Sequence, residues 1–394
     1  MEVLFISHKY PPGIGGMQKQ SFELINGFIK SHKVHMIVHD ESRESKFYFF
    51  LLLRYRIHKT FKLFPGIQIV HCNDGVCAFF CRYIHKRYNR PVLLTFHGLD
   101  LLWPNSFYQA MLPGLVKNFS AVVSVSEFTR KQCVSRGFRS EICHTVLNGV
   151  DVNDGADPLK INSQLIALFK DLKLQDKKIL VSIGRPVRRK GFSWFAKNVL
   201  TKLDASYAYV VLGPSTHYSR LEKYLLNLLP HKFRNQLELF FGWSSDQDEL
   251  SKYLASEMNQ SKAWWFDSLT YDSILFALDQ ADLFVMPNVH VEGDAEGFGL
   301  VALESNMQNT FVLASQIDGI PSAVNDKYNG WLLQSGNSSD WVKGIRSFFK
   351  LSINERTRLA LKSKEYALNK YSWDNMVSGY EDVFNKYINK NTDI

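Results

Sequence analysis

The sequence predicts an α/β protein with two domains, each built around a parallel sheet. Short apolar runs typical of buried strands alternate with helical patterns along most of the chain. In both halves a glycine-bearing loop follows a strand and precedes a helix, where α/β sheets bind ligands. The length of 394 residues suits two domains of ordinary size. We place the first domain at residues 1–160 and the second at residues 161–371.

The first domain is expected to contain a series of short apolar strands. A helix is expected between the first two, from Gln18 to Lys30, and another begins at Glu127. The expected strands are Glu2–Ser7, Val34–His39, Ile67–Cys72, Val92–Phe96 and Ala121–Ser126.

The second domain follows a polar segment, residues 154–177, that reads as a linker and a short helix. Its expected strands are Lys178–Gly184, Tyr207–Gly213, Leu237–Gly242, Asp282–Pro287 and Phe311–Ser315. A helix is expected at Leu300–Met307. Residues 243–271 are longer than a normal connection and receive no function.

Composition favours a globular enzyme, with 45% apolar and 22% charged residues. No apolar run is long enough to span a bilayer. The first residues lack the features of a signal peptide and read as a strand, so a cytoplasmic protein is expected. A net charge of +9 implies an anionic partner, whether nucleotide, membrane or nucleic acid.

The five cysteines show neither Cys-x-x-Cys pairs nor an even count, which favours reduced and mostly buried thiols. The alternative is a zinc site made of His71, Cys72, Cys77 and Cys81.

The stretch Pro287–Glu304 joins a buried strand to a helix through an acidic, glycine-bearing loop. The helix N-terminus suits a phosphate, and Gly297 and Gly299 allow a ligand to approach the backbone. The carboxylates of Glu296 and Glu304 cannot bind the phosphate, which is also an anion. They suit sugar or ribose hydroxyls, because an ionised carboxylate only accepts hydrogen bonds.

A second loop, Arg185–Gly191, carries four cations directly after a strand. Such a loop points to an anion, and phosphate is the obvious one. The alternative is a solvated basic loop.

The run Glu-Gly-Phe-Gly-Leu-Val-x-x-Glu after the strand resembles the Glu-x7-Glu motif of retaining glycosyltransferases of family 4. The resemblance covers nearly the whole chain and implies the GT-B fold, two Rossmann-like domains facing a central cleft. It implies that the first domain binds the acceptor and the second the nucleotide sugar. It also implies that a helix at 372–390 packs back on the first domain. Asn148-Gly149 matches a turn of the family and reads as structural.

The resemblance also implies roles for individual residues. Glu296 would contact the donor sugar and Glu304 would hold the ribose, while Arg185 and Lys190 would clamp the diphosphate. Arg188 and Arg189 lie outside the matched pattern and read as extra, exposed cations. His97, in the run His97-Gly-Leu-Asp100, would contact the donor sugar, with Asp100 as a helper. The implied catalytic residues are His97, Glu296, Arg185 and Lys190; the implied donor-binding residues are Gly15, Gly16, Arg185, Lys190, Glu296, Gly297, Phe298, Gly299, Leu300 and Glu304.

The implied reaction moves a hexose or N-acetylhexosamine from a UDP- or GDP-linked sugar to a glycan hydroxyl, with retention. A lipid-linked acceptor in cell-surface polysaccharide or lipopolysaccharide synthesis is expected. No Asp-x-Asp site is evident, so we expect no metal and no other cofactor. The alternatives are a nucleotide-sugar epimerase on the same fold and a non-catalytic nucleic-acid-binding protein. No nucleic-acid motif supports the second, so no nucleic-acid partner is expected.

Residues 46–62 combine bulky apolar residues with five Lys or Arg and no acid. This composition favours a helix that lies on an anionic membrane surface, with aromatic residues at the acyl boundary. We therefore predict peripheral binding to the inner face of the cell membrane through this stretch. The alternative is a core helix with a solvated charged face.

Overall fold

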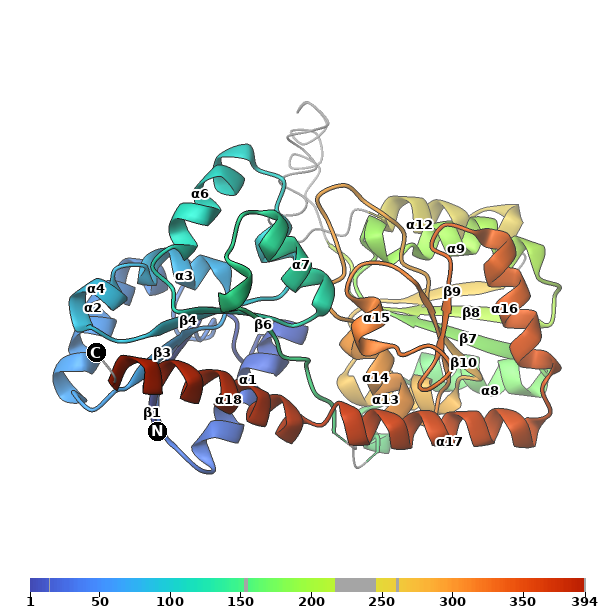
Figure 1. The fold of residues 1–394 in the computed structure, drawn as a ribbon. Helices are drawn as coiled ribbons and strands as arrows, with labels where there is room; N and C mark the ends of the chain where they lie inside the picture. Colours follow the sequence, from blue (N-terminus) through green and yellow to red (C-terminus); the bar gives the residue numbers. More distant parts are fainter. Residues whose placement is uncertain (14, 152–154, 217–245, 260–261, 393–394) are drawn as a thin grey trace. The chain divides into compact units, whose positions relative to one another are not determined.

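The computed structural model describes residues 1–394 except 14, 152–154, 217–245, 260–261 and 393–394 (Figure 1). The chain forms two compact units. The first unit comprises Met1–Gly149 and Tyr371–Ile394, and the second comprises Val150–Lys370.

The first unit is built on a six-stranded parallel sheet of order β2-β1-β3-β4-β5-β6. Phe5 is level with Met36 on one side and with His71 on the other. Strand β2 lies on one side of β1, and all later strands of this sheet lie on the other side. The strands are β1 Glu2–Ser7, β2 Lys33–Val38, β3 Ile69–Cys72, β4 Val92–Phe96, β5 Ala121–Ser124 and β6 Cys143–Thr145.

Helices cover both faces of this sheet (Figure 1). Its central strands β1, β3, β4 and β5 are accordingly buried on both sides, as expected for a parallel sheet. The helices are α1 Gly16–Ile29, α2 Lys46–Leu63, α3 Gly75–Cys81, α4 Ile84–Tyr88, α5 Leu99–Leu102, α6 Ser106–Val116, α7 Glu127–Ser135, the 3-10 turn Ser140–Ile142 and α18 Trp373–Thr392.

The second unit repeats the architecture with a parallel sheet of order β12-β11-β10-β7-β8-β9. Side chains alternate between two cores: Leu180 faces one, whereas Ile179 and Val181 face the other. The strands are β7 Lys178–Ile183, β8 Tyr207–Leu212, β9 Ala263–Phe266, β10 Leu283–Met286, β11 Val312–Ser315 and β12 Trp331–Leu333.

The helices of the second unit pack into these two cores. They are α8 Ser163–Leu174, α9 Phe192–Asn198, α12 Gln247–Leu254, α13 Tyr271–Gln280, α14 Leu300–Met307, α15 Ile320–Ala323, α16 Ser338–Lys350 and α17 Ile353–Lys370, with 3-10 turns at Pro158–Lys160, Arg188–Lys190, Leu200–Lys202 and Glu257–Asn259.

Most predicted elements form within about two residues of their expected bounds. The predicted strand at Leu237–Gly242 lies outside the described residues. The strands β6, β9 and β12 were not predicted; β6 and β12 have only three residues each, and β9 lies in the segment 243–271 that received no assignment. The segment left without an assignment, 243–271, contains β9 and α12.

Helix α18 completes the core of the first unit. The hydroxyl of buried Tyr380 lies 2.9 Å from the Thr95 hydroxyl on β4, and Gln20 of α1 donates to Tyr380 at 3.3 Å. Phe384 packs with Phe5 and Phe28, with ring centroids 6.0 and 5.1 Å away. Residues from the far end of the sequence thus close one face of the first sheet.

Gly149 lies where only a hydrogen side chain fits. A Cβ there would lie 2.5 Å from the backbone N and Cα of Trp373, at the start of α18. Gly149→Ala should therefore destabilise the first unit by about 1–3 kcal/mol, the cost of overpacking. Thermal unfolding measures this loss.

Gly114 provides the matched control, because a Cβ at this position in α6 meets nothing within 4 Å. Gly114→Ala should raise stability by about 0.5–1 kcal/mol. An equal change in melting temperature for both variants would contradict the packing argument.

All five cysteines are free and buried, which confirms the expected reduced state. The alternative zinc site does not form around His71 in the described part of the chain. His71 instead lies in the core, with Nε2 3.0 Å from the Thr95 hydroxyl, and burial lowers its pKa to about 3. Among the described residues, no helix is long and apolar enough to cross a membrane.

Candidate functional site

The strongest cluster of charged side chains in the second unit joins two loops at the carboxyl edge of its sheet. One loop follows β7 and the other follows β10, and these strands are neighbours. The ammonium of Lys190, from the first loop, lies 2.7 Å from Glu296 of the second. Both side chains are mostly buried, with 11% and 14% of their surface exposed. The structure therefore brings together two of the predicted catalytic residues.

Backbone contacts hold the two loops together. Gly191 has a φ of +68°, and a Cβ there would lie only 2.1 Å from the carbonyl oxygen of Pro287. The amide of Val289 donates to the carbonyl of Arg189 at 2.9 Å. Glycine at 191 is thus required by both its conformation and its neighbour. The close approach fixes the distance between Lys190 and Glu296.

The prediction that Arg189 is merely an extra, exposed cation is wrong. Its guanidinium lies 3.1 Å from both oxygens of Asp294, and its Nε lies 3.6 Å from Glu296. The side chain is only 17% exposed. The reason is the 3-10 turn at Arg188–Lys190, which directs Arg189 and Lys190 toward the acidic loop.

The electrostatics of this cluster keep Glu296 ionised. Burial alone would raise its pKa, but the charges of Lys190 and Arg189 outweigh burial and bring the pKa to about 2. The neighbouring Asp318 accepts a hydrogen bond from the Glu296 amide at 3.2 Å. Burial raises the pKa of Asp318 to about 6. Glu296 is therefore a firmly charged carboxylate between two cations.

The remaining predicted residues of the second unit lie close in sequence to the residues of this cluster. Arg185 is exposed at the start of the β7 loop, and Glu304 is half-buried as the fifth residue of α14. Phe298 and Gly299 are buried, whereas Gly297 and Leu300 are partly exposed at the helix start. A Cβ at Gly319 would lie 2.0 Å from the Gly297 carbonyl, so a further loop packs tightly against the acidic one.

In the first unit, the predicted residues lie at the carboxyl edge of its own sheet. Gly15 caps α1 and Gly16 is its first residue. His97 follows β4, and its Nε2 lies 2.9 Å from the carbonyl oxygen of Asn73, to which it donates. Asp100, the predicted helper, accepts a hydrogen bond from the His97 amide at 2.8 Å. Its carboxylate therefore holds the loop that carries His97.

Sequence reasoning missed the ion pair between Arg189 and Asp294. The two residues are 105 positions apart, so no local pattern joins them. The sequence offered one signal for this pair. The β7 loop carries four cations, and a diphosphate clamp needs only two of them. The cluster can bind an anion through cations and a hydroxylated group through Glu296.

Two family models match this chain. The family model for "Glycosyl transferases group 1" matches residues 165–366, just over half of the chain. The model for "Glycosyltransferase Family 4" matches residues 14–154.

Individual relatives are distant. An uncharacterised 41.2 kDa protein of the cps region of Klebsiella pneumoniae is 23% identical, over 84% of this chain and 82% of its own. Alpha-maltose-1-phosphate synthase of Mycobacterium tuberculosis is 24% identical, over 81% and 79%. HepE of Anabaena, solved with UDP and with UDP-glucose, superposes with TM-scores of 0.71 and 0.69 at 14% and 15% identity. These alignments cover 98% of this chain and 100% of HepE.

The two parallel six-stranded sheets and these structural neighbours confirm the predicted GT-B fold. With a family model covering more than half of its length, the chain belongs to the group 1 glycosyl transferases, and it is a glycosyltransferase.

Proposed function

We propose that this enzyme transfers a hexose or N-acetylhexosamine from a UDP- or GDP-linked sugar to a hydroxyl of a glycan acceptor, with retention. The observation that carries the proposal is the Lys190–Glu296 pair at the carboxyl edge of the second sheet. A nucleotide sugar presents an anionic diphosphate beside a neutral, hydroxylated sugar. A buried cation next to a buried carboxylate matches that pair of groups.

The roles follow from the charges. Lys190 and exposed Arg185 would neutralise the leaving diphosphate, a preorganised contribution of the kind that lowers barriers most. Glu296 would accept hydrogen bonds from the sugar hydroxyls, and Glu304 from the ribose. Complexes of the neighbour HepE with UDP and UDP-glucose support a uridine nucleotide as donor. No metal ion is needed in this scheme, because the cations supply the positive charge.

A donor panel tests the proposal. UDP-glucose, UDP-galactose, UDP-N-acetylglucosamine and GDP-mannose are incubated with the enzyme, and nucleotide release is measured with and without a lipid extract as acceptor. Nucleotide release from one donor, stimulated by the extract, is the expected result. Conversion of the donor sugar without nucleotide release would support the epimerase instead.

We further propose that the acceptor is lipid-linked, as in cell-surface polysaccharide or lipopolysaccharide synthesis, and that α2 lies on the membrane that carries it. Helix α2 has two opposite apolar stripes. Phe49, Leu53, Ile57 and Phe61 face the core of the first unit. Phe47, Leu51 and Tyr55, also spaced by four, are 72%, 61% and 63% exposed. A helix packed on one side alone would not need the second stripe.

Exposed cations flank the outer stripe, namely Lys46, Arg54, Lys59 and Lys62. Arg54 lies over the ring of Tyr83, and Arg56 forms a bidentate pair with Glu44 at 2.6 and 2.7 Å. Lysines near an anionic surface contribute about 1 kcal/mol each. Apolar side chains between cations are what an anionic lipid surface binds.

Leu51→Asp should therefore abolish co-sedimentation with phosphatidylglycerol vesicles at low salt. Changing both Lys59 and Lys62 to Gln should weaken the binding to these vesicles several-fold. High salt should release the unchanged protein, because screening shortens the reach of its charges. Leu361→Asp, at a 55% exposed site on α17, is the matched control and should bind normally. Equal binding by Leu51→Asp and the control would rule out this surface.

A further inference from the structure

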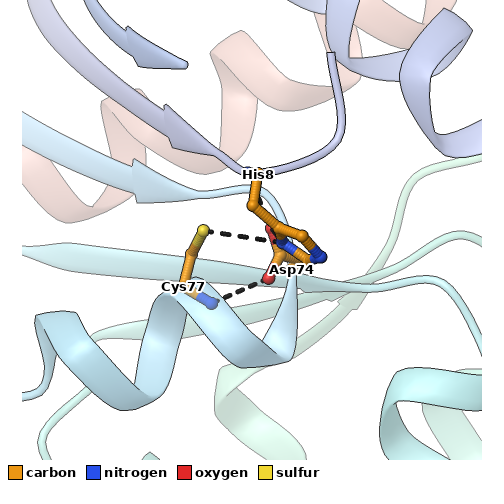
Figure 2. Close-up of side chains that lie close together, drawn as sticks. All are labelled: His8, Asp74 and Cys77. Atoms are coloured by element: carbon orange, nitrogen blue, oxygen red, sulfur yellow. Dashed lines mark hydrogen bonds and ion pairs between the residues drawn. The ribbon is translucent and has the colours of Figure 1, made fainter. Parts of the chain in front are cut away.

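Asp74 in the first unit shows how a buried carboxylate is held when its partners are structural. One of its oxygens lies 2.8 Å from Nδ1 of His8, and the other accepts the Cys77 amide at 2.7 Å (Figure 2). The side chain is fully buried and caps α3. The imidazole and the amide thus hold one oxygen each, and together they join the loop after β1 to α3.

Glu296, in the second unit, is held by more groups than this. The ammonium of Lys190 lies 2.7 Å from its Oε2 oxygen, and Nε of Arg189 lies 3.6 Å from the same oxygen. The side-chain amide of buried Asn288 donates to this oxygen as well, at 3.4 Å. Three groups therefore converge on one carboxylate oxygen, and two of them are cations.

Lys190 has two tasks under the proposed function. It pairs with Glu296 in the structure, and it would neutralise the diphosphate of the bound donor. A diphosphate carries more negative charge than a single carboxylate, so it competes for the ammonium. Glu296 must nevertheless stay ionised, because it has to accept hydrogen bonds from the sugar hydroxyls. The arrival of the donor therefore weakens the charge balance of the residue that binds its sugar.

Arg189 is held in place independently of Lys190. Its Nη1 donates to both oxygens of Asp294 at 3.1 Å, and the Asp294 side chain is only 3% exposed. Its backbone carbonyl accepts from the Val289 amide at 2.9 Å. Burial alone would lower the pKa of Arg189, but the charges of Asp294 and Glu296 raise it, so the guanidinium stays charged.

The Nε hydrogen of Arg189 is left over by these contacts. Within the described part of the chain, this buried nitrogen has no hydrogen-bond partner. It lies 3.6 Å from Oε2 of Glu296, just beyond hydrogen-bonding distance. Leaving a buried donor unpaired is unfavourable, so a small shift of the carboxylate toward Nε would be stabilising. Arg189 therefore holds a second hydrogen bond in reserve for Glu296.

The surroundings of Glu296 make a second cation necessary. Asp318, on the loop after β11, accepts the Glu296 amide at 3.2 Å, and Asp294 lies two residues before Glu296. Without Arg189, a Glu296 that shared Lys190 with a diphosphate would be buried between other anions. The further charged or titratable groups of this neighbourhood are Arg185 on the β7 loop and His290 on the acidic loop.

We propose that Arg189 is a positioning residue that becomes the main partner of Glu296 when the donor diphosphate becomes the partner of Lys190. The inference rests on the proposed function. In the free enzyme both cations serve Oε2 of Glu296. In the donor complex Nε of Arg189 donates to this oxygen, and Lys190 serves the phosphate. Glu296 thus meets the sugar both ionised and fixed in direction, and no proton is transferred in the exchange.

Proton uptake on nucleotide binding tests this exchange without any turnover. UDP is titrated by calorimetry at mildly acidic pH in buffers of different ionisation enthalpy, which reports the protons taken up. In Arg189→Gln, Lys190 still balances Glu296 before UDP binds, but afterwards the carboxylate is poorly compensated and its pKa rises. This variant should take up as much as about one proton more per UDP than the unchanged enzyme. Arg189→Lys keeps the charge and should remove most of the excess.

The pH dependence of kcat, measured with the donor that the panel identifies, gives a second readout. Glu296 in the unchanged enzyme is ionised down to a pKa of about 2. A raised pKa in Arg189→Gln means that the ionised form is lost as pH falls and returns as pH rises. The kcat of this variant, divided by that of the unchanged enzyme, should therefore fall several-fold toward acidic pH. Taking the ratio cancels the effect of Asp318, whose pKa of about 6 influences both enzymes.

Three variants separate this role from a structural one. Arg189→Gln combined with Asp294→Asn leaves no carboxylate unpaired at 294, so it should recover melting temperature yet keep most of the excess proton uptake. Adding Glu296→Gln to Arg189→Gln should abolish the excess. Arg130→Gln is the matched control, because Arg130 pairs with Glu127 at 2.7 Å on α7 of the first unit, and it should behave like the unchanged enzyme.

Equal proton uptake by Arg189→Gln and the unchanged enzyme, with UDP bound to both, would overturn the inference. An excess that survives the loss of the Glu296 carboxylate would overturn it too. Failure of the unchanged enzyme to bind UDP or GDP would instead overturn the proposed function.

Discussion

Replacing Lys190 with alanine is expected to lower kcat/KM for sugar transfer by on the order of a hundredfold or more. Lys190 is a mostly buried cation fixed in place by Glu296 at 2.7 Å. A preorganised charge that meets a developing negative charge contributes on this scale, because little reorganisation occurs during the reaction. Steady-state kinetics with the identified donor measure the loss.

Lys197→Ala is the control for this change. Lys197 lies on α9, shortly after Lys190 in sequence, and pairs with Glu249 at a partly exposed position. Its loss should leave kcat/KM nearly unchanged. Arg185→Ala should resemble Lys190→Ala, and the double change should be less than additive if both serve one diphosphate. Activity near that of the unchanged enzyme would exclude the tested residue from the diphosphate site.

Glu296→Gln and Glu304→Gln should affect different steps. Glutamine at 296 keeps the shape but removes the charge that pairs with Lys190 and Arg189. Both cations then become more available to a diphosphate, so UDP should bind at least as tightly. Turnover should nevertheless fall by about a hundredfold, because contacts to the reacting sugar matter most in the transition state.

Glu304→Gln should instead weaken the binding of UDP by about tenfold, with kcat little changed. The ribose is held equally in the ground and transition states, so its contacts contribute to binding alone. Calorimetric titration of UDP or GDP, combined with kcat, separates the two effects. The same loss of nucleotide affinity in both variants would reject this division of roles.

The fold was predictable from sequence because its elements are local patterns. Leu300–Met307 forms a helix with the expected bounds, and β1 spans the expected Glu2–Ser7. The helix carries apolar residues at helical spacing, and β1 is an unbroken apolar run from Val3 to Ile6. The strands that escaped prediction are short, and β9 consists of Ala-Trp-Trp-Phe in a segment with no recognisable boundary.

The charged pairs were not predictable for a different reason. The chain shows four cations in the β7 loop, but which of them turn inward depends on a 3-10 turn and on Gly191. The partners of Arg189 and His8 lie 105 and 66 residues away in sequence. Only the parallel order of the strands brings such residues to one edge. Sequence patterns therefore indicated the loops but not the contacts between them.

The position of α18 has a consequence for how the chain matures on the ribosome. Tyr380 and Phe384 complete the core of the first unit, yet they are translated only after all of Val150–Lys370. The second unit is continuous in sequence and can fold as it emerges. The first unit cannot complete its core until α18 has been made, so the apolar face of α1 stays uncovered while more than 200 residues are translated. This takes about 10–50 s at ordinary translation rates. A nascent chain whose second unit has already folded therefore still needs its first unit to be protected from aggregation.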